Sequence, residues 1–185
     1  RLLMPYFILI ALPVIIWAFG ENYRIKCGKR LLLETRSASI DIFMLLFFFL
    51  LAFRGLQCGI DTKQYLNLFN KYNAYSLIQL FADYNHELGY KLLNKFVGTI
   101  ANNYQLLLAL TALICVLPVW LFYRRESESH ILTIALFLTV FPFVMYFSGI
   151  RQAVAISLGV PAWYCAKNKK LFKFAVVILL AMLFH

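Results

Sequence analysis

The chain has 185 residues, of which 63% are hydrophobic and only 14% are charged, and its formal net charge is +10. A soluble domain carries about a quarter charged residues, so this composition excludes an ordinary soluble domain and predicts helices that cross a lipid bilayer. The basic residues lie in short loops between apolar runs, which argues against a nucleic-acid-binding surface. The four cysteines show no CxxC or Cys/His spacing, so the sequence indicates neither a zinc site nor a disulfide framework.

The first part of the chain predicts three membrane spans. Residues 2–19 form the first span, and residues 104–123 form the third. The second span extends over residues 40–56, around an apolar core of only 12 residues. It reaches a sufficient length because Asp41 and Arg54 can extend toward the two interfaces from its opposite ends.

Residues 131–166 form a run in which Arg151 is the one charged residue. As a single helix this run of 36 residues would measure about 54 Å, against a hydrocarbon core of roughly 30 Å. We therefore expect it to break at Ser148-Gly149. The resulting spans are 131–147, 153–166 and a sixth that begins at Phe174.

The orientation follows from the distribution of lysine and arginine. The segments 21–39, 124–129 and 167–173 hold 11 of the 18 basic residues, and basic loops of membrane proteins face the cytoplasm. The stretch 55–103 then forms an extracytoplasmic loop, on the same side as the break before Arg151. Within it, "LGYKLLNKFVGTI" has apolar residues at helical spacing with its two lysines, Lys91 and Lys95, opposite, which predicts a helix lying along the membrane interface.

We therefore predict an all-α, polytopic membrane bundle with about six spans, which forms one domain over residues 1–185. The chain begins with an arginine in place of methionine and ends at His185 inside an apolar run. These two features predict a fragment that lacks further spans at its C-terminal end.

Polar residues gather on the predicted outer face. On a helix that begins near Ser148, this residue lies on one face with Arg151, Gln152 and two small residues, and such a stripe faces protein or a cavity rather than lipid. Arginine binds phosphate oxygens with two hydrogen bonds and keeps its charge at any ordinary pH. The alternative is an interfacial arginine among lipid headgroups or in a structural ion pair.

Two further segments carry polar candidates. In "RGLQCGIDTKQYLNLF", Arg54 ends a span and Asp61 is placed to cap a helix that carries Tyr65. In "NHELGY", His86 and Glu87 are either general acid–base groups or part of a solvated loop. The sequence contains no Gly-rich phosphate loop, no GxSxG and no HExxH motif.

In chain order these segments resemble the EpsG family of bacterial membrane proteins, which is related to Wzy-type polysaccharide polymerases. The resemblance rests on "LAFRGLQCGIDTKQYLNLF", "ELGYKLLNKFVGTIANNYQLL", "YFSGIRQAVAISL" and the final "LFH". It implies a multi-pass protein of the bacterial cytoplasmic membrane, active on its outer face in making capsule, O-antigen or exopolysaccharide. The implied reaction transfers a growing glycan from undecaprenyl pyrophosphate to a sugar hydroxyl of the next lipid-linked repeat unit.

The resemblance also suggests roles for individual residues. Arg54 and Arg151 would bind the pyrophosphate and stabilise it as a leaving group, while Gln152 and Tyr65 would hydrogen-bond phosphate or sugar. The implied partners are the lipid-linked oligosaccharide, membrane lipid and other polysaccharide-assembly proteins, without nucleic acid. No metal or other cofactor is implied.

The base that activates the acceptor hydroxyl would be Asp61, Glu87 or His185, of which His185 matches the family's "FH" position. Three other functions stay open: a transporter or flippase of lipid-linked sugars, a non-catalytic membrane component of a glycan assembly complex, and a membrane acyltransferase. A flippase needs polar residues along a path through the membrane, whereas the predicted spans carry no carboxylate or lysine at mid-depth.

Overall fold

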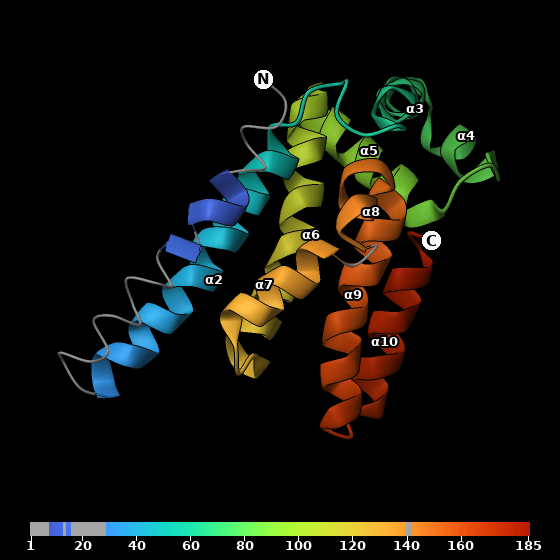
Figure 1. Ribbon diagram of the computed structural model, residues 1–185. Coiled ribbons are helices and arrows are strands. Elements are labelled where there is room, and N and C mark those ends of the chain that lie inside the picture. The colour runs from blue at the N-terminus through green and yellow to red at the C-terminus, as the bar shows by residue number, and fades with distance from the viewer. Residues whose placement is uncertain (1–7, 13, 16–28, 140–141) are drawn as a thin grey trace.

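The computed structural model describes residues 8–12, 14–15, 29–139 and 142–185 (Figure 1). Within these ranges the regular secondary structure is helical, without strands, which confirms the predicted all-α class. The first predicted span, residues 2–19, lies largely outside the described residues.

Four helices form the long part of the molecule: α2 (Lys29–Ala52), α6 (Tyr104–Glu126), α9 (Ile150–Lys167) and α10 (Leu171–Met182). The start of α2 corrects the prediction of a loop over residues 21–39, because the helix already begins at Lys29. Residues 29–39 contain no proline or glycine. Most of them are leucine, arginine, lysine, glutamate or alanine, which favour helix. The helix ends at Ala52, four residues before the predicted end of the span.

One described helix, α6, is long and apolar enough to cross a membrane. With 23 residues it measures about 35 Å, which matches a bilayer core with some tilt. The described residues also include three shorter apolar helical segments, Ala38–Ala52, His130–Thr139 and Leu171–Met182. The number of membrane crossings therefore stays a prediction.

The predicted break at Ser148-Gly149 is confirmed, because α8 (Pro142–Ser148) ends there and Gly149 is the N-cap residue of α9. The predicted span 131–147 is instead divided between α7 (His130–Thr139) and α8. Pro142 is the first residue of α8, a position that suits proline because its missing N–H donor is not needed there and its fixed φ favours the start of a helix.

Residues 55–103 fold into three shorter helices, α3 (Thr62–Ala74), α4 (Leu77–Ala82) and α5 (Leu88–Ile100). They cover one end of the long helices, and the C-terminal end of α10 approaches them from below in Figure 1. The helix α5 has the bounds expected from its amphipathic pattern, and α4 begins with a capping box formed by Ser76 and Gln79.

The two lysines of α5 face the neighbouring helices α3 and α4, whereas the prediction placed them on an exposed polar side. Lys91 is only 3% exposed, and its ammonium group donates to the carbonyl oxygens of Leu80 and Asp83 at the end of α4. Lys95 donates to the carbonyls of Asn73 and Tyr75 at the end of α3, at 2.8 and 2.7 Å. The last carbonyls of a helix have no partner within it, so both lysines supply donors that these short helices lack.

The opposite side of α5 is apolar and exposed. Leu92, Phe96 and Ile100, spaced four residues apart, are 38%, 57% and 61% exposed. An exposed apolar stripe of this kind suits a membrane interface, so α5 keeps the predicted amphipathic character with its polar side buried against protein.

The basic segments gather at the end of the molecule opposite α3–α5. Figure 1 shows the start of α2, the end of α6 and the α9–α10 turn at this end. Two contacts tie it together: Asp41 accepts a hydrogen bond from Trp120 at 2.7 Å and lies 3.7 Å from Arg124. Asp41 was expected to extend toward an interface and instead joins α2 to α6. The gathering of basic residues agrees with the predicted orientation, whereas which face is cytoplasmic stays a prediction.

Candidate functional site

The N-terminal end of α5 and the C-terminal end of α10 meet through backbone contact at Gly89. Its N–H donates to the carbonyl oxygen of Leu183 at 2.7 Å. A Cβ atom at position 89 would lie only 2.7 Å from that oxygen and 2.9 Å from the Leu183 Cβ. A residue without a side chain is therefore required here, and the close approach brings Glu87 next to His185.

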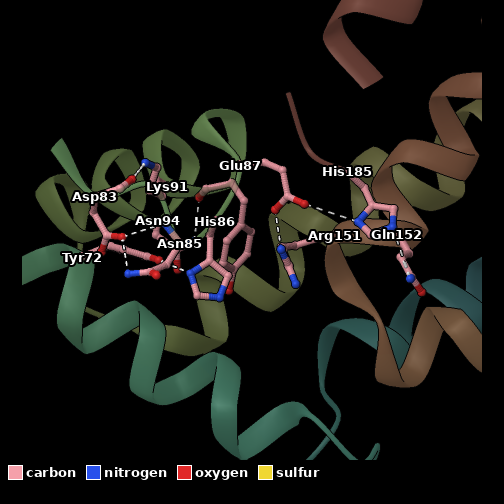
Figure 2. A network of polar contacts seen from close by, with 11 residues as sticks. Tyr72, Asp83, Asn85, His86, Glu87, Lys91, Asn94, Arg151, Gln152 and His185 are labelled. Carbon is pink, nitrogen blue, oxygen red and sulfur yellow. Dashed lines mark hydrogen bonds and ion pairs between the residues drawn. The ribbon is translucent and has the colours of Figure 1, made fainter. Parts of the chain in front are cut away.

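Glu87 is the centre of a network of polar contacts (Figure 2). One carboxylate oxygen accepts a hydrogen bond from Arg151 Nη1, and the other lies 3.4 Å from His185 Nδ1. The three side chains come from the start of α5, the start of α9 and the end of the chain, so the network exists only in the folded protein. Their side chains are 24–47% exposed, which leaves them accessible to a ligand.

Gln152 extends the network on the far side of His185. Its amide nitrogen lies 3.3 Å from His185 Nε2 (Figure 2). With this amide N–H as donor, Nε2 carries the lone pair and Nδ1 carries the proton that faces Glu87. A carboxylate that orients an imidazole through Nδ1 leaves Nε2 as the basic atom, which is the arrangement of a general base with its orienting partner.

The charges around Glu87 favour its ionised form. Burial acts to raise the pKa of Glu87, but the hydrogen bonds from its own backbone and from Arg151 outweigh that effect, so the pKa is lowered. A carboxylate with a lowered pKa is a weak proton acceptor. Among the residues of this network, His185 is therefore the better base and Glu87 the better orienting group.

A second pair lies beside this network. The Tyr72 hydroxyl and His86 Nδ1 are 2.5 Å apart, and the Tyr72 ring is fully buried. Burial, and next the positive charge of Arg151, lowers the pKa of His86, so its ring is neutral at neutral pH. The sequence identified His86 only as one of two alternatives, and nothing local to Tyr72 pointed to this contact, because the two residues are 14 positions apart on either side of α4.

Asp83 anchors the loop that carries His86 and Glu87. It forms an ion pair with Lys71 at 2.8 Å and accepts a hydrogen bond from the Asn85 backbone at 2.9 Å. The hydrogen bond from Lys71, followed by that from the Asn85 backbone, lowers the pKa of Asp83 to about 2. The loop is thereby held between α3 and α5 while Glu87 extends toward Arg151.

Arg54 lies deeper than the network. The residue is 6% exposed, and its Nη1 donates to the carbonyls of Tyr146 and Phe147 at 2.7 and 3.2 Å, near the end of α8. No ion pair joins Arg54 to another described residue. The backbone at Gly59 also passes close to the carbonyl of Phe147. There φ is 91°, and a Cβ atom would lie 2.0 Å from the Phe147 oxygen.

Tyr65 connects Arg54 with Arg151. It is 6% exposed, and it interacts electrostatically with both guanidinium groups. Each arginine also keeps a buried Nε–H that has no hydrogen-bond partner among the described residues. Two guanidinium groups with unused donors, on either side of a tyrosine hydroxyl, can supply hydrogen bonds to an anion with many oxygens.

The structure thus brings together most of the residues predicted from the sequence and separates one. Glu87, His185, Arg151 and Gln152 form one chain of contacts, and Tyr65 interacts electrostatically with both Arg151 and Arg54. Asp61 occupies the N-cap position of α3, as predicted, but its side chain makes no capping hydrogen bond and, among the described residues, does not contact Glu87, Arg151 or His185. The described residues contain no group of three or more His, Cys, Asp or Glu side chains placed to hold a metal ion.

Comparison with known proteins gives one match. The model of the EpsG family matches residues 40–185, which is most of the chain and includes every residue of the network. Neither a curated protein nor a solved structure matches the chain. The family match and the apolar helix α6 together identify a membrane protein.

Proposed function

Because the chain belongs to the EpsG family, whose general role is polysaccharide polymerisation, we propose that it polymerises lipid-linked oligosaccharide repeat units. The proposed donor is a glycan on undecaprenyl pyrophosphate, and the proposed acceptor is a sugar hydroxyl of the next repeat unit. The reaction would take place on the outer face of the bacterial cytoplasmic membrane, in the making of capsule, O-antigen or exopolysaccharide. Other polysaccharide-assembly proteins are its expected partners.

The observation that carries the proposal is the placement of two arginines and a carboxylate–histidine pair within one neighbourhood. Arg151 and Arg54 adjoin Tyr65, and Arg151 also contacts Glu87, which in turn lies 3.4 Å from His185. Transfer from a pyrophosphate needs positive groups for the leaving group and a base for the incoming hydroxyl, and both are present here.

In the proposed reaction, the bond between the anomeric carbon of the donor glycan and the pyrophosphate oxygen breaks. The electron pair stays on the pyrophosphate, and Arg151 stabilises the added negative charge through its guanidinium donors. Arg54 is buried, and its charge adds to the positive potential at this point. Binding of pyrophosphate to Arg151 exchanges one anionic partner, Glu87, for another.

The acceptor hydroxyl attacks the same anomeric carbon and loses its proton to the base. We assign the base to His185 Nε2 and the orienting role to Glu87, on the geometry described above. Gln152 and Tyr65 donate hydrogen bonds to phosphate or sugar oxygens. Asp61 stays a third candidate for the base, without a contact to the network in this structure.

The test compares Arg151→Ala and Arg151→Lys in the full-length gene, expressed in a strain that lacks it, with the glycan chain lengths read from a ladder on a gel. We expect both variants to lose long chains while single repeat units still reach the surface, because Lys cannot reproduce the paired donors of Arg. Arg124→Lys is the matched control, since Arg124 lies at the C-terminal end of α6, away from Arg151, and its nitrogen is 3.7 Å from the Asp41 carboxylate.

Two results would count against the proposal. Unit-length glycan trapped inside the Arg151 variants would indicate a flippase, because transport and not polymerisation would have failed. A ladder equal to that of the wild type would show that Arg151 is not needed for polymerisation and has a structural role as the partner of Glu87.

A further inference from the structure

An apolar groove lies between α6 and α9, at the end of the molecule away from Glu87 and Arg151. Its volume is about 210 Å³. The α6 wall consists of Pro118, Leu121 and Phe122, and the α9 wall consists of Val160, Pro161 and Tyr164. Nothing in the proposed reaction uses this groove.

The two prolines give a physical reason for the groove. Each lies inside a helix and has no N–H for the carbonyl four residues earlier, so each weakens the regular packing of its helix at that level. Elsewhere α6 and α9 are in close contact, with Thr111, Ala112 and Cys115 of α6 and Ile150 and Ala153 of α9 lining the same small internal space. The wider opening between the two helices lies near Pro118 and Pro161.

The mouth of the groove carries excess positive charge. Arg125 and Glu126 both line it. Glu126 is neutralised by Lys167, at 2.6 Å, and the Lys167 ammonium group also lies 4.9 Å from the centre of the Trp163 ring. Arg125 is exposed and forms no ion pair with another described residue. Further exposed cations follow in the α9–α10 turn and at the start of α10: Lys169, Lys170 and Lys173.

We propose that this groove binds an anionic phospholipid, with an acyl chain between α6 and α9 and the phosphate on Arg125. An apolar slot that opens beside an unpaired guanidinium complements an amphiphile with negative charge at one end. The guanidinium of Arg125, which lines the groove, favours an anionic headgroup over a zwitterionic one. The proposal needs only the membrane location of the protein and does not rest on the polymerisation reaction.

The groove is separate from the site around Arg151. Tyr164 lies 13 residues after Arg151 on the same helix, which corresponds to about 20 Å along the axis. A headgroup at Arg125 would therefore lie at the opposite end of the bundle from a pyrophosphate at Arg151. The polyprenyl carrier, with its phosphate at Arg151, is for this reason not the occupant that we propose.

The experiment uses the purified full-length protein in detergent and counts bound lipids by native mass spectrometry. Phosphatidylglycerol and phosphatidylcholine with identical acyl chains are the probes. We expect the first phosphatidylglycerol to bind about fivefold more tightly than phosphatidylcholine, because the positive choline group of phosphatidylcholine offsets the phosphate charge that faces Arg125. Arg125→Gln should abolish this preference, whereas Lys173→Gln, which changes a charge at the same end outside the groove, should keep it.

Two further measurements test the position of the acyl chain. Leu121→Trp fills the groove and should weaken the binding of both lipids. Cys165 also lines the groove, so saturating phosphatidylglycerol should slow its alkylation by N-ethylmaleimide in an otherwise cysteine-free protein. This second measurement leaves the groove residues unchanged and therefore does not depend on how Leu121→Trp folds.

The proposal is overturned by any of four results. Equal affinity for the two lipids would show that the groove does not select an anionic headgroup. An equal effect of Arg125→Gln and Lys173→Gln would show that the preference comes from diffuse positive charge and not from a site at Arg125. Unchanged alkylation of Cys165 would place the acyl chain elsewhere. Undecaprenyl phosphate that binds more tightly than phosphatidylglycerol, and through Arg125, would assign the groove to the carrier lipid.

Discussion

At the scale of single residues, the chemistry of the site depends on whether Glu87 accepts a proton or orients its two neighbours. Its carboxylate contacts both Arg151 and His185, and its pKa is lowered, so it is ionised whenever the protein is folded near neutral pH. An ionised carboxylate between a guanidinium and an imidazole holds the first in place and orients the second. Under our proposal, Glu87 is therefore a positioning residue and His185 the base.

This assignment predicts rate losses of different size for two variants. With purified full-length protein and lipid-linked repeat units, His185→Gln should lower the polymerisation rate by about 10²–10⁴-fold, because it removes the base. Glu87→Gln should lower the rate less, because it removes the group that orients the imidazole and leaves the base in place. The rates are measured by the appearance of dimeric glycan.

Glu128→Gln is the control, since Glu128 is an exposed carboxylate in the loop after α6 and should not change the rate. The opposite order would contradict the assignment: if Glu87→Gln lowered the rate more than His185→Gln, Glu87 would be the base.

At the scale of secondary-structure elements, the site depends on how closely α5 approaches the end of α10. The hydrogen bond from Gly89 to Leu183 fixes this approach, and the buried Lys91 and the half-buried Lys95 hold α5 against α4 and α3. Both lysines donate to backbone carbonyls, although the sequence pattern alone would assign their side chains to solvent. The polar side of α5 is thus used for packing, which leaves its apolar side for the membrane interface.

Gly89→Ala should disturb the site through this contact. The added Cβ would lie 2.7 Å from the Leu183 oxygen, so α10 must move away, at a cost of about 1–3 kcal/mol in unfolding free energy. We expect a lower melting temperature in detergent and shorter glycan chains in cells. Gly159→Ala is the matched control: its Cβ would meet open space in the middle of α9, where alanine is favoured over glycine by about 1 kcal/mol. Equal melting temperatures for the two variants would show that the approach of α10 tolerates a side chain at position 89.

At the scale of the whole molecule, the helices separate two kinds of surface. Figure 1 shows α3–α5 at one end of the long helices and the α9–α10 turn at the other. The polar network and the exposed apolar stripe of α5 belong to the first end, and the basic segments and the groove between α6 and α9 belong to the second. If basic residues face the cytoplasm, the network faces outward, where lipid-linked repeat units are polymerised under our proposal.

Thiol labelling tests this orientation. In a full-length protein whose native cysteines are replaced, Tyr84→Cys lies in a loop at the network end, at a position that is 94% exposed. We expect a membrane-impermeant maleimide to label it in intact cells, whereas Lys169→Cys in the α9–α10 turn should react only after permeabilisation. The reverse labelling would place the network in the cytoplasm and would contradict the proposed outward-facing reaction.

The sequence by itself determined the all-α class, the break at Ser148-Gly149 and the bounds of α5, because these follow from composition, glycine placement and helical periodicity, which are local. It also pointed to the family. From that resemblance came Arg54 and Arg151 for the pyrophosphate and Asp61, Glu87 or His185 for the base, and these assignments stay predictions. It did not predict the early start of α2 or the division of the span 131–147, since helix boundaries depend on contacts as well as on propensity.

Only the tertiary structure decided which polar side chains meet. Glu87 and Arg151 are 64 residues apart in sequence, and Lys91 was expected in solvent because its pattern looks like that of any amphipathic helix. The direction in which an amphipathic helix turns its polar face depends on whether neighbouring helix ends offer unpaired carbonyls, and this is a property of the packed molecule. The groove could not be predicted from the sequence either, because Pro118 and Pro161 become neighbours only when α6 and α9 pack together.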